Sequence, residues 1–166
     1  MAETPPTGRE AMHIHQLKQL RSLLRAVRPA NSFYEKKLKA YVHLSSEEVR
    51  PATHRKGNIA ASRAKETRQV VQRLDESANT IFLDEKGDRL TSMSFASSIK
   101  VWESRGIQQL TFAFGGAYGF DTMQLPANAG KLRISEMTLN HQLVRLMFLE
   151  QLYRAFTIIR GEPYHH

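Results

Sequence analysis

The chain has 166 residues, with 24 Lys and Arg against 16 Asp and Glu, and no Cys. This length is typical of one domain with a stable core, and the lack of Cys excludes disulfides, thiolate metal sites and cysteine nucleophiles. No apolar run reaches the roughly 18 residues of a membrane span, and the polar start lacks the apolar core of a signal peptide. We therefore expect a cytoplasmic protein with no membrane partner.

Basic residues are concentrated in the first half of the chain. Residues 1–73 hold 15 Lys and Arg against 6 Asp and Glu, whereas residues 74–166 hold 9 against 10. A one-sided basic field attracts polyanions, most commonly nucleic acid, although a solvated basic helix face is the alternative interpretation. Within this half, Lys36, Lys37 and Lys39 form a short cluster that we expect to contact RNA.

The first elements along the chain are predicted to be helical. Residues 1–11 are expected to form a flexible extension, with one domain over residues 12–166. Apolar residues recur at helical spacing from Leu17 to Val27, and Pro29 ends this pattern. Asn31 is expected to cap a second helix, whose inward side chains are Phe33, Leu38 and Val42.

The next segments lead to a third helix. Leu44–Arg50 is either a short strand or a loop, and Pro51–Asn58 reads as a mobile basic loop. Asn58–Leu74 predicts a helix, with a buried side formed by Ile59, Val70, Val71 and Leu74.

The second half alternates strands with helices. Thr80–Asp84 is a short apolar strand ended by a turn at Glu85–Asp88. A helix capped by Ser92 or Ser94 then runs through Trp102 and closes at Gly106. Further strands are predicted at Gln109–Phe114 and Lys131–Met137.

Asn140 caps a long final helix, whose core stripe is predicted to be Leu143, Met147, Leu152, Phe156 and Ile159. The alternation of strands with helices predicts an α/β fold with a mostly parallel sheet flanked by helices.

A glycine-rich segment, Gly115–Gly116–Ala117–Tyr118–Gly119, follows the strand predicted at Gln109–Phe114. Glycines at the carboxyl end of a strand let a ligand approach the backbone closely. The spacing matches neither the P-loop nor the dinucleotide fingerprint, so a tight structural turn is the alternative interpretation.

The chain ends in Tyr164–His165–His166, either an idle tail or a tail held in a site where His handles a proton. Neither His165–His166 nor His13–x–His15 has a carboxylate at ligand spacing, so no metal site is predicted. His141, near the start of the final helix, is expected to be a hydrogen-bonded structural residue.

Several motifs together resemble one family. The run Met137–Phe156, the terminal run Arg160–His166, Phe82–Glu85 and the glycine-rich segment closely resemble the ribosomal RNA large subunit methyltransferase H family, of the SPOUT class. The likeness covers about residues 58–166. It implies an α/β fold whose carboxyl-terminal chain is threaded into a trefoil knot.

The resemblance also implies a function. Members use S-adenosylmethionine to methylate N3 of a pseudouridine in 23S rRNA within the assembled ribosome, and they act as homodimers. By motif match, the cofactor contacts are Leu83, Gly115, Gly116, Ser135, Glu136, Met137, Thr138, Leu139 and Asn140. The pair at the target base is Tyr164 and His165, and His166 is expected to contact RNA.

Two features depart from the family pattern. Met12–Leu24 reads as His-rich and helical where members begin with an apolar strand, and His166 stands where members often carry Arg. A catalytically impaired, ribosome-associated binding or assembly protein of the same fold is therefore the alternative function. A metal-dependent nuclease is a weaker one, because no carboxylate cluster with metal-ligand spacing stands out.

Overall fold

The computed structural model describes residues 12–19, 26–50, 58–76 and 78–166. The extension predicted for residues 1–11, and the loop predicted at Pro51–Asn58 except for Asn58 itself, lie outside these ranges. No helix in the described ranges is long and apolar enough to cross a membrane.

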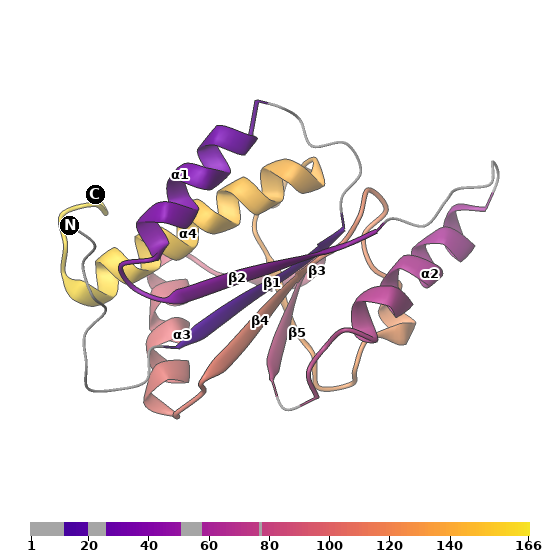
Figure 1. Ribbon diagram of the computed structural model, residues 1–166, viewed down its shortest axis with the longest axis horizontal. Coiled ribbons are helices and arrows are strands. Elements are labelled where there is room, and N and C mark those ends of the chain that lie inside the picture. The colour runs from indigo at the N-terminus through magenta and orange to yellow at the C-terminus, as the bar shows by residue number, and fades with distance from the viewer. Residues whose placement is uncertain (1–11, 20–25, 51–57, 77) are drawn as a thin grey trace.

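A five-stranded parallel sheet forms the centre of the molecule (Figure 1). Its order is β2-β1-β4-β3-β5, with the bounds β1 (His13–Gln19), β2 (His43–Val49), β3 (Asn79–Arg89), β4 (Gln109–Phe114) and β5 (Gly130–Arg133). The helices are α1 (Arg28–Leu38), α2 (Ile59–Val71), α3 (Ser92–Ser104), the short η1 (Thr122–Gln124) and α4 (His141–Arg160). The predicted α/β class and parallel sheet are confirmed.

Helices cover both faces of the sheet, with α1, α3 and α4 on one side and α2 on the other (Figure 1). The larger core packs three buried phenylalanines, Phe95, Phe112 and Phe148, between the sheet and the helices α3 and α4. The smaller core includes Val70 of α2 and Phe82 of β3. Burial on both faces explains why β4, which is almost entirely buried, carries the apolar run Phe112–Ala113–Phe114, as strands of parallel sheets commonly do.

The helix predicted over the first described residues is wrong as far as residue 19, and residues 20–25, which continue the predicted pattern, lie outside the described ranges. His13–Gln19 is instead the strand β1, which pairs with β2 on one side and β4 on the other. Ile14 and Gln16 are both buried, while His13 and His15 on the opposite face are partly exposed. In the sequence, the sign of this strand is the short alternation of apolar and polar residues from Met12 to His15. The helical spacing of Leu17, Leu20 and Leu24 predicted a helix instead.

The start of the next helix also differs from its prediction. Pro29 does not end a helix but lies in the first turn of α1, where its missing N–H is tolerated. Asn31 is buried inside α1 rather than capping it, and Val27 takes the N-cap position. Phe33, expected inside, is 53% exposed, whereas Leu38 and Val42 are buried as predicted.

The remaining boundaries follow the sequence more closely. The ambiguous Leu44–Arg50 segment is the strand β2, and Asn58 caps α2 through its side chain. However, Ile59 is 56% exposed. It is the first residue of α2. The N-cap of α3 is Thr91 rather than Ser92 or Ser94.

Two strand predictions needed correction. β3 does not end at Asp84: after a register shift between Leu83 and Asp88 it continues to Arg89. Gly87 is required there, because a Cβ would lie 2.6 Å from the backbone of Leu132. The predicted strand Lys131–Met137 is shorter and ends at Arg133.

The final helix begins where predicted, because the Asn140 side chain accepts the N–H of Gln142 at 2.9 Å. It ends at Gly161, whose φ of 68° reverses the chain. The predicted core stripe is right at Leu152 and Phe156, but Leu143 and Met147 are each 39% exposed. Phe148, Leu149 and Ala155 form the buried side in their place.

Candidate active site

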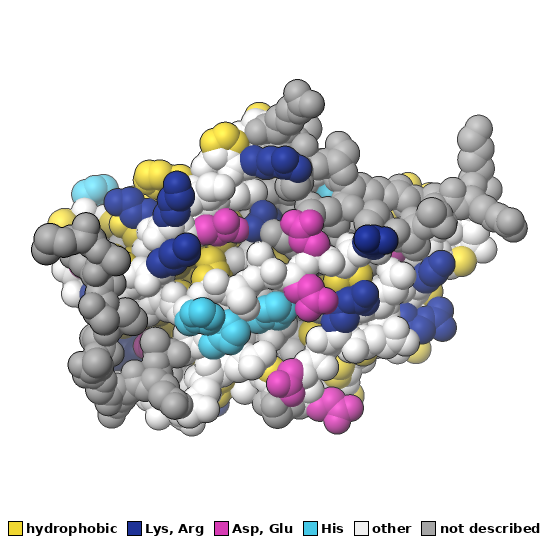
Figure 2. Space-filling view, in the orientation of Figure 1, with side chains coloured by type: hydrophobic (Ala, Val, Ile, Leu, Met, Phe, Trp, Pro, Cys, Tyr) yellow, Lys and Arg dark blue, Asp and Glu magenta, His cyan; other side chains and the backbone are white. Residues whose placement is uncertain are grey.

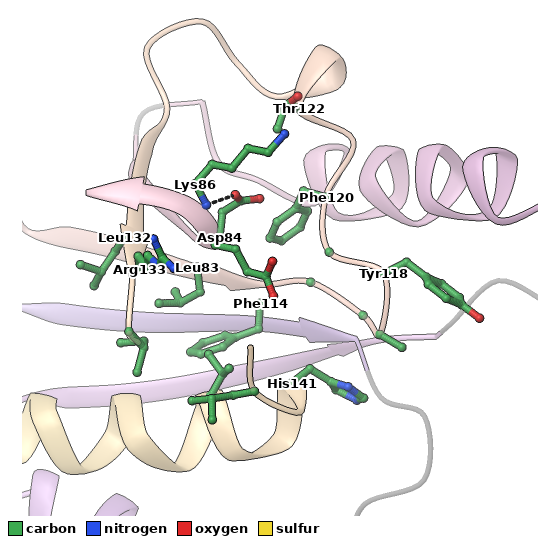
Figure 3. A pocket seen from close by; sticks show the side chains of 18 of the residues that line it. Leu83, Asp84, Lys86, Phe114, Tyr118, Phe120, Thr122, Leu132, Arg133 and His141 are labelled. Carbon is green, nitrogen blue, oxygen red and sulfur yellow. Dashed lines mark hydrogen bonds between the residues drawn. The ribbon is translucent and has the colours of Figure 1, made fainter. Parts of the chain in front are cut away.

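A cavity of about 480 Å³ lies at the carboxyl ends of β3, β4 and β5. Ligands of parallel α/β sheets bind at this edge, where the loops that follow the strands meet. The lining includes Leu83 and Asp84 of β3, Phe114 at the end of β4, and Leu132 of β5 (Figure 3). α2 and the amino end of α4 contribute Arg63 and His141.

The glycine segment is both a tight turn and part of the cavity wall. Gly116 and Gly119 form an isolated antiparallel bridge, and Gly119 adopts a φ of 67° that favours glycine. A Cβ on Gly115 would lie 3.1 Å from the backbone of Gly119. All residues from Gly115 to Gly119 line the cavity. The segment is therefore a tight turn, and its contact with a ligand stays a prediction that its position allows.

The stretch Ser135–Asn140 presents alternate residues to the cavity. Ser135, Met137 and Leu139 line it, whereas Glu136, Thr138 and Asn140 do not. The Arg133 side chain shapes this stretch by donating to the backbone carbonyls of Ser135 and Glu136, each at 2.8 Å. The Glu136 side chain points elsewhere and pairs with Arg89.

The lining suits S-adenosylmethionine by the chemistry of its side chains. Leu83, Phe114, Leu132 and Val144 supply apolar surface for an adenine ring. The carboxylates of Asp84, Glu85 and Asp121 offer negative charge to a sulfonium and an ammonium group. The volume of the cavity also falls within the range that is typical of cofactor sites.

Motif reasoning missed several residues of the cavity, among them Arg63, Asp84, Tyr118 and His141. Asp84 could have been found, because it ends the apolar run of β3 at the edge where ligands bind. Arg63 gives no such signal, since nothing in the sequence shows which face of α2 meets the sheet edge. His141 was expected to be hydrogen-bonded, but its Nε2 is buried and has no hydrogen-bond partner among the described residues.

The carboxyl-terminal residues do not reach this cavity within one chain. The Tyr164 hydroxyl donates to Glu150 at 3.2 Å, and its ring packs on Tyr153 with 4.8 Å between centroids. The guanidinium of Arg154 lies over the Tyr164 ring and within 3.3 Å of His165 Nδ1. Burial and the hydrogen bond with Tyr34 raise the pKa of Tyr164 above its usual value, which keeps the phenol protonated.

The predicted RNA contacts Lys36, Lys37 and Lys39 are exposed around the end of α1. Figure 2 shows basic side chains over α1 and over α2, with the His side chains of the sheet between them. His166 is exposed at the end of the tail. No group of three or more His, Asp or Glu in the described part of the chain is arranged to hold a metal ion.

Comparison with known proteins identifies the family. The family model described as predicted SPOUT methyltransferase matches residues 13–165. The ribosomal RNA large subunit methyltransferase H of Geotalea uraniireducens is 42% identical over 134 residues, covering 80% of this chain and 86% of that protein. The protein of the same name from Flavobacterium johnsoniae is 38% identical over 135 residues, covering 80% and 85%. The chain therefore belongs to the SPOUT methyltransferases and, among them, to the ribosomal RNA large subunit methyltransferase H family.

Proposed function

We propose that this protein transfers a methyl group from S-adenosylmethionine to N3 of a pseudouridine in 23S rRNA, on the assembled ribosome. The observation that carries the proposal is the cavity at the carboxyl ends of β3, β4 and β5, in a chain of the SPOUT family. The relatives' printed name supports the large-subunit rRNA as substrate. The predicted contacts Leu83, Gly115, Gly116, Ser135, Met137 and Leu139 would hold the cofactor there.

Methyl transfer requires positioning above all. The attacking nitrogen must lose its proton and approach the methyl carbon in line with the bond that breaks, so fixed geometry supplies much of the rate. A cavity built from strand ends and a constrained glycine turn is suited to that task. S-adenosylmethionine supplies the electrophilic methyl group, and the protein orients the two reactants.

The distance of the tail from the cavity supports a homodimer. Val144 lines the cavity, whereas Tyr164 is held at Glu150, six residues or about 9 Å further along α4. Leu143 and Met147 on α4 and Phe33 on α1 are apolar and exposed. In our proposal a second copy covers these side chains in an isologous contact and brings its Tyr164 and His165 to the target base. Light scattering at micromolar concentration tests this, and the mass of a monomer would contradict it.

The same proposal includes the trefoil knot typical of the SPOUT class, formed by the chain that follows β4. The basic cluster at Lys36, Lys37 and Lys39, together with His166, would contact the rRNA backbone, because phosphate contacts from basic residues supply most of such affinity.

Mapping of modified nucleotides by mass spectrometry tests the reaction directly. In 23S rRNA from a strain that lacks this protein, we expect one pseudouridine to lose a methyl group, and the purified protein should restore it on isolated ribosomes. A modification map identical to that of the parent strain would contradict the proposal.

The alternative, a binding or assembly protein that has lost its chemistry, rests on the departures from the family pattern. The first departure, a helix in place of the first strand, does not hold, because His13–Gln19 forms the strand β1. The other, His166 in place of an Arg, remains. Calorimetric titration with S-adenosylmethionine separates the two functions, because an absence of binding up to millimolar concentration would favour the alternative.

A further inference from the structure

Two buried polar atoms belong to side chains that line the cavity, and we refer to the part of the lining that these side chains form as the Arg63–His141 wall. They are Nε of Arg63, on α2, and Nε2 of His141, at the start of α4, and neither has a hydrogen-bond partner among the described residues. Figure 3 shows His141 on the same side as Tyr118, across from Leu132 and Arg133. Buried polar groups are nearly always hydrogen-bonded. Because the same two side chains line the cavity, a small rotation of either toward a polar ligand there would give its nitrogen a partner.

This wall is distinct from the predicted cofactor contacts. Those contacts come from the end of β3, the first two glycines after β4 and the stretch after β5, whereas Arg63 and His141 come from α2 and α4. The second reactant of a methyl transfer must lie next to the cofactor. The wall of Arg63 and His141 is therefore available to the target base.

The hydrogen-bonding character of the two side chains is complementary to one kind of base. Arg63 can only donate. Burial lowers the pKa of His141, although the Glu66 carboxylate opposes this effect, so at pH 7 the neutral imidazole has one nitrogen that accepts a proton. The imide edge of a uracil-type base offers a carbonyl acceptor, the N3–H donor and a second carbonyl acceptor.

We propose that this wall binds the imide edge of the target base, with Arg63 donating to a carbonyl oxygen and His141 accepting the proton of N3. The inference rests on the proposed function and adds the residue that activates the nucleophile. Rotation about the Cβ–Cγ bond of His141 exchanges which ring atoms face the cavity. The imidazole therefore needs no backbone movement to present its accepting nitrogen.

The N3–H bond breaks and the proton passes to His141, which becomes an imidazolium. The electron pair left on N3 forms the new bond to the methyl carbon, and the carbon–sulfur bond of S-adenosylmethionine breaks with its pair retained by sulfur. Arg63 stabilises the negative charge that develops on the carbonyl oxygen, and the buried Glu66 stabilises the imidazolium.

The charged and titratable groups to consider beside His141 are Glu66 and those that line the same cavity. Glu66 and Arg63 come from α2, and Tyr118 and Asp121 come from the segment that follows β4. The other charged residues of the lining, Asp84, Glu85, Lys86 and Arg133, lie across the cavity. Of these, Glu66 is the one whose charge acts on the His141 pKa.

The test is a single-turnover assay of the His141→Gln variant. The methyl donor is tritiated S-adenosylmethionine, and the acceptor is the large ribosomal subunit from a strain that lacks this protein. We expect a loss of about 100-fold at pH 7, which shrinks as the pH rises and N3 of the base ionises without help. In this proposal His165 positions the base and His141 takes the proton, so the loss in the matched tail variant His165→Gln should not shrink with pH. A His141→Gln loss that is constant across pH, or no loss, would overturn the assignment.

Two further measurements do not depend on turnover. By NMR, the His141 imidazole should titrate below pH 6.5 in the wild type and lower still in Glu66→Gln, and an unchanged value in that variant would contradict the role of Glu66. Calorimetry should show that Arg63→Lys and His141→Gln bind S-adenosylmethionine as the wild type does, and weakened binding would place both residues in the cofactor site instead. If the wild-type protein methylates no rRNA, the proposed function is refuted. If the wild-type protein is active and the His141→Gln and Arg63→Lys variants are equally active, only this inference is refuted.

Discussion

Thr67 on α2 accepts the backbone N–H of Asp121 at 2.8 Å and donates its own hydroxyl hydrogen to the carbonyl of Arg63 at 2.9 Å. Thr67 is buried, and its bond with Asp121 links the segment after the glycine turn to α2. Phe120, next in the chain to Asp121, packs its ring edge-on against Phe82 at 5.1 Å. These two contacts hold one wall of the cavity against the sheet.

Thr67→Val should weaken this wall. It keeps the shape of the side chain but leaves the partly buried N–H of Asp121 without its acceptor, which costs about 1 kcal/mol, the lower end of the range for buried groups. We expect a lower free energy of unfolding in urea and weaker binding of S-adenosylmethionine by calorimetry. Thr67→Ser, which retains the hydroxyl, is the control, and equal stability of all three proteins would contradict the prediction.

Gly116→Val should abolish binding of S-adenosylmethionine without unfolding the protein. Gly116 lines the cavity and pairs with Gly119 in the tight turn, so a branched side chain takes space that the ligand needs. The far-ultraviolet circular dichroism should be unchanged while calorimetry shows no binding. Gly106→Ala, at a glycine remote from the cavity with a φ of 73°, reports the effect of strain alone. Normal binding by Gly116→Val would mean that the glycine segment has another role.

Replacing Lys36, Lys37 and Lys39 together with Gln should weaken binding to ribosomes and flatten its dependence on salt. The three side chains are exposed, and each lost phosphate contact reduces the slope of log affinity against log salt by about 0.7–0.9. Binding measured from 50 to 300 mM KCl, about the range where such contacts dominate, provides the test. Lys100→Gln with Arg105→Gln, also exposed, is the control. An unchanged slope would mean that the lysines only solvate α1.

Removing Tyr164–His166 should abolish methyl transfer but not binding of S-adenosylmethionine, because none of these residues lines the cavity. The deletion also removes the Tyr164 hydrogen bond to Glu150 and the contact with Arg154, so we expect a stability loss of about 1–2 kcal/mol. The variant Tyr164→Phe removes the hydroxyl and keeps the ring. Retained activity would indicate that the ring stacks on the base, and lost activity would indicate that the hydroxyl is needed. A truncated protein that methylates at the full rate would contradict a catalytic role for the tail.

His13→Gln should reduce the loss of stability at acidic pH. Burial first, and then the neighbouring His43 and His15, lower the pKa of His13 below 6.5. The unfolded chain therefore binds a proton more readily than the folded one, and stability present above pH 6.5 is lost as the pH falls through the folded pKa. Urea unfolding at pH 7 and pH 5 should show a smaller decrease for His13→Gln than for the wild type. An equal decrease would show that His13 does not contribute.

The sequence by itself determined the elements whose signals are local. Asn58 and Asn140 begin helices because an Asn side chain satisfies a free N–H wherever the chain turns into a helix. The apolar run of β4 and the glycines after it predicted a buried strand that leads to a ligand edge, and the motifs of residues 137–166 pointed to the family. Each of these depends only on neighbours within a few residues.

Only the tertiary structure decided the features that depend on distant neighbours. β1 is a strand because β2 and β4 pair with it on both sides, although the spacing of Leu17, Leu20 and Leu24 predicted a helix. Phe33 and Met147 are apolar but exposed, since burial depends on what packs against a helix rather than on its own pattern. Arg63 and His141, 78 positions apart in the sequence, line one cavity only because α2 and α4 meet the same edge of the sheet from opposite faces.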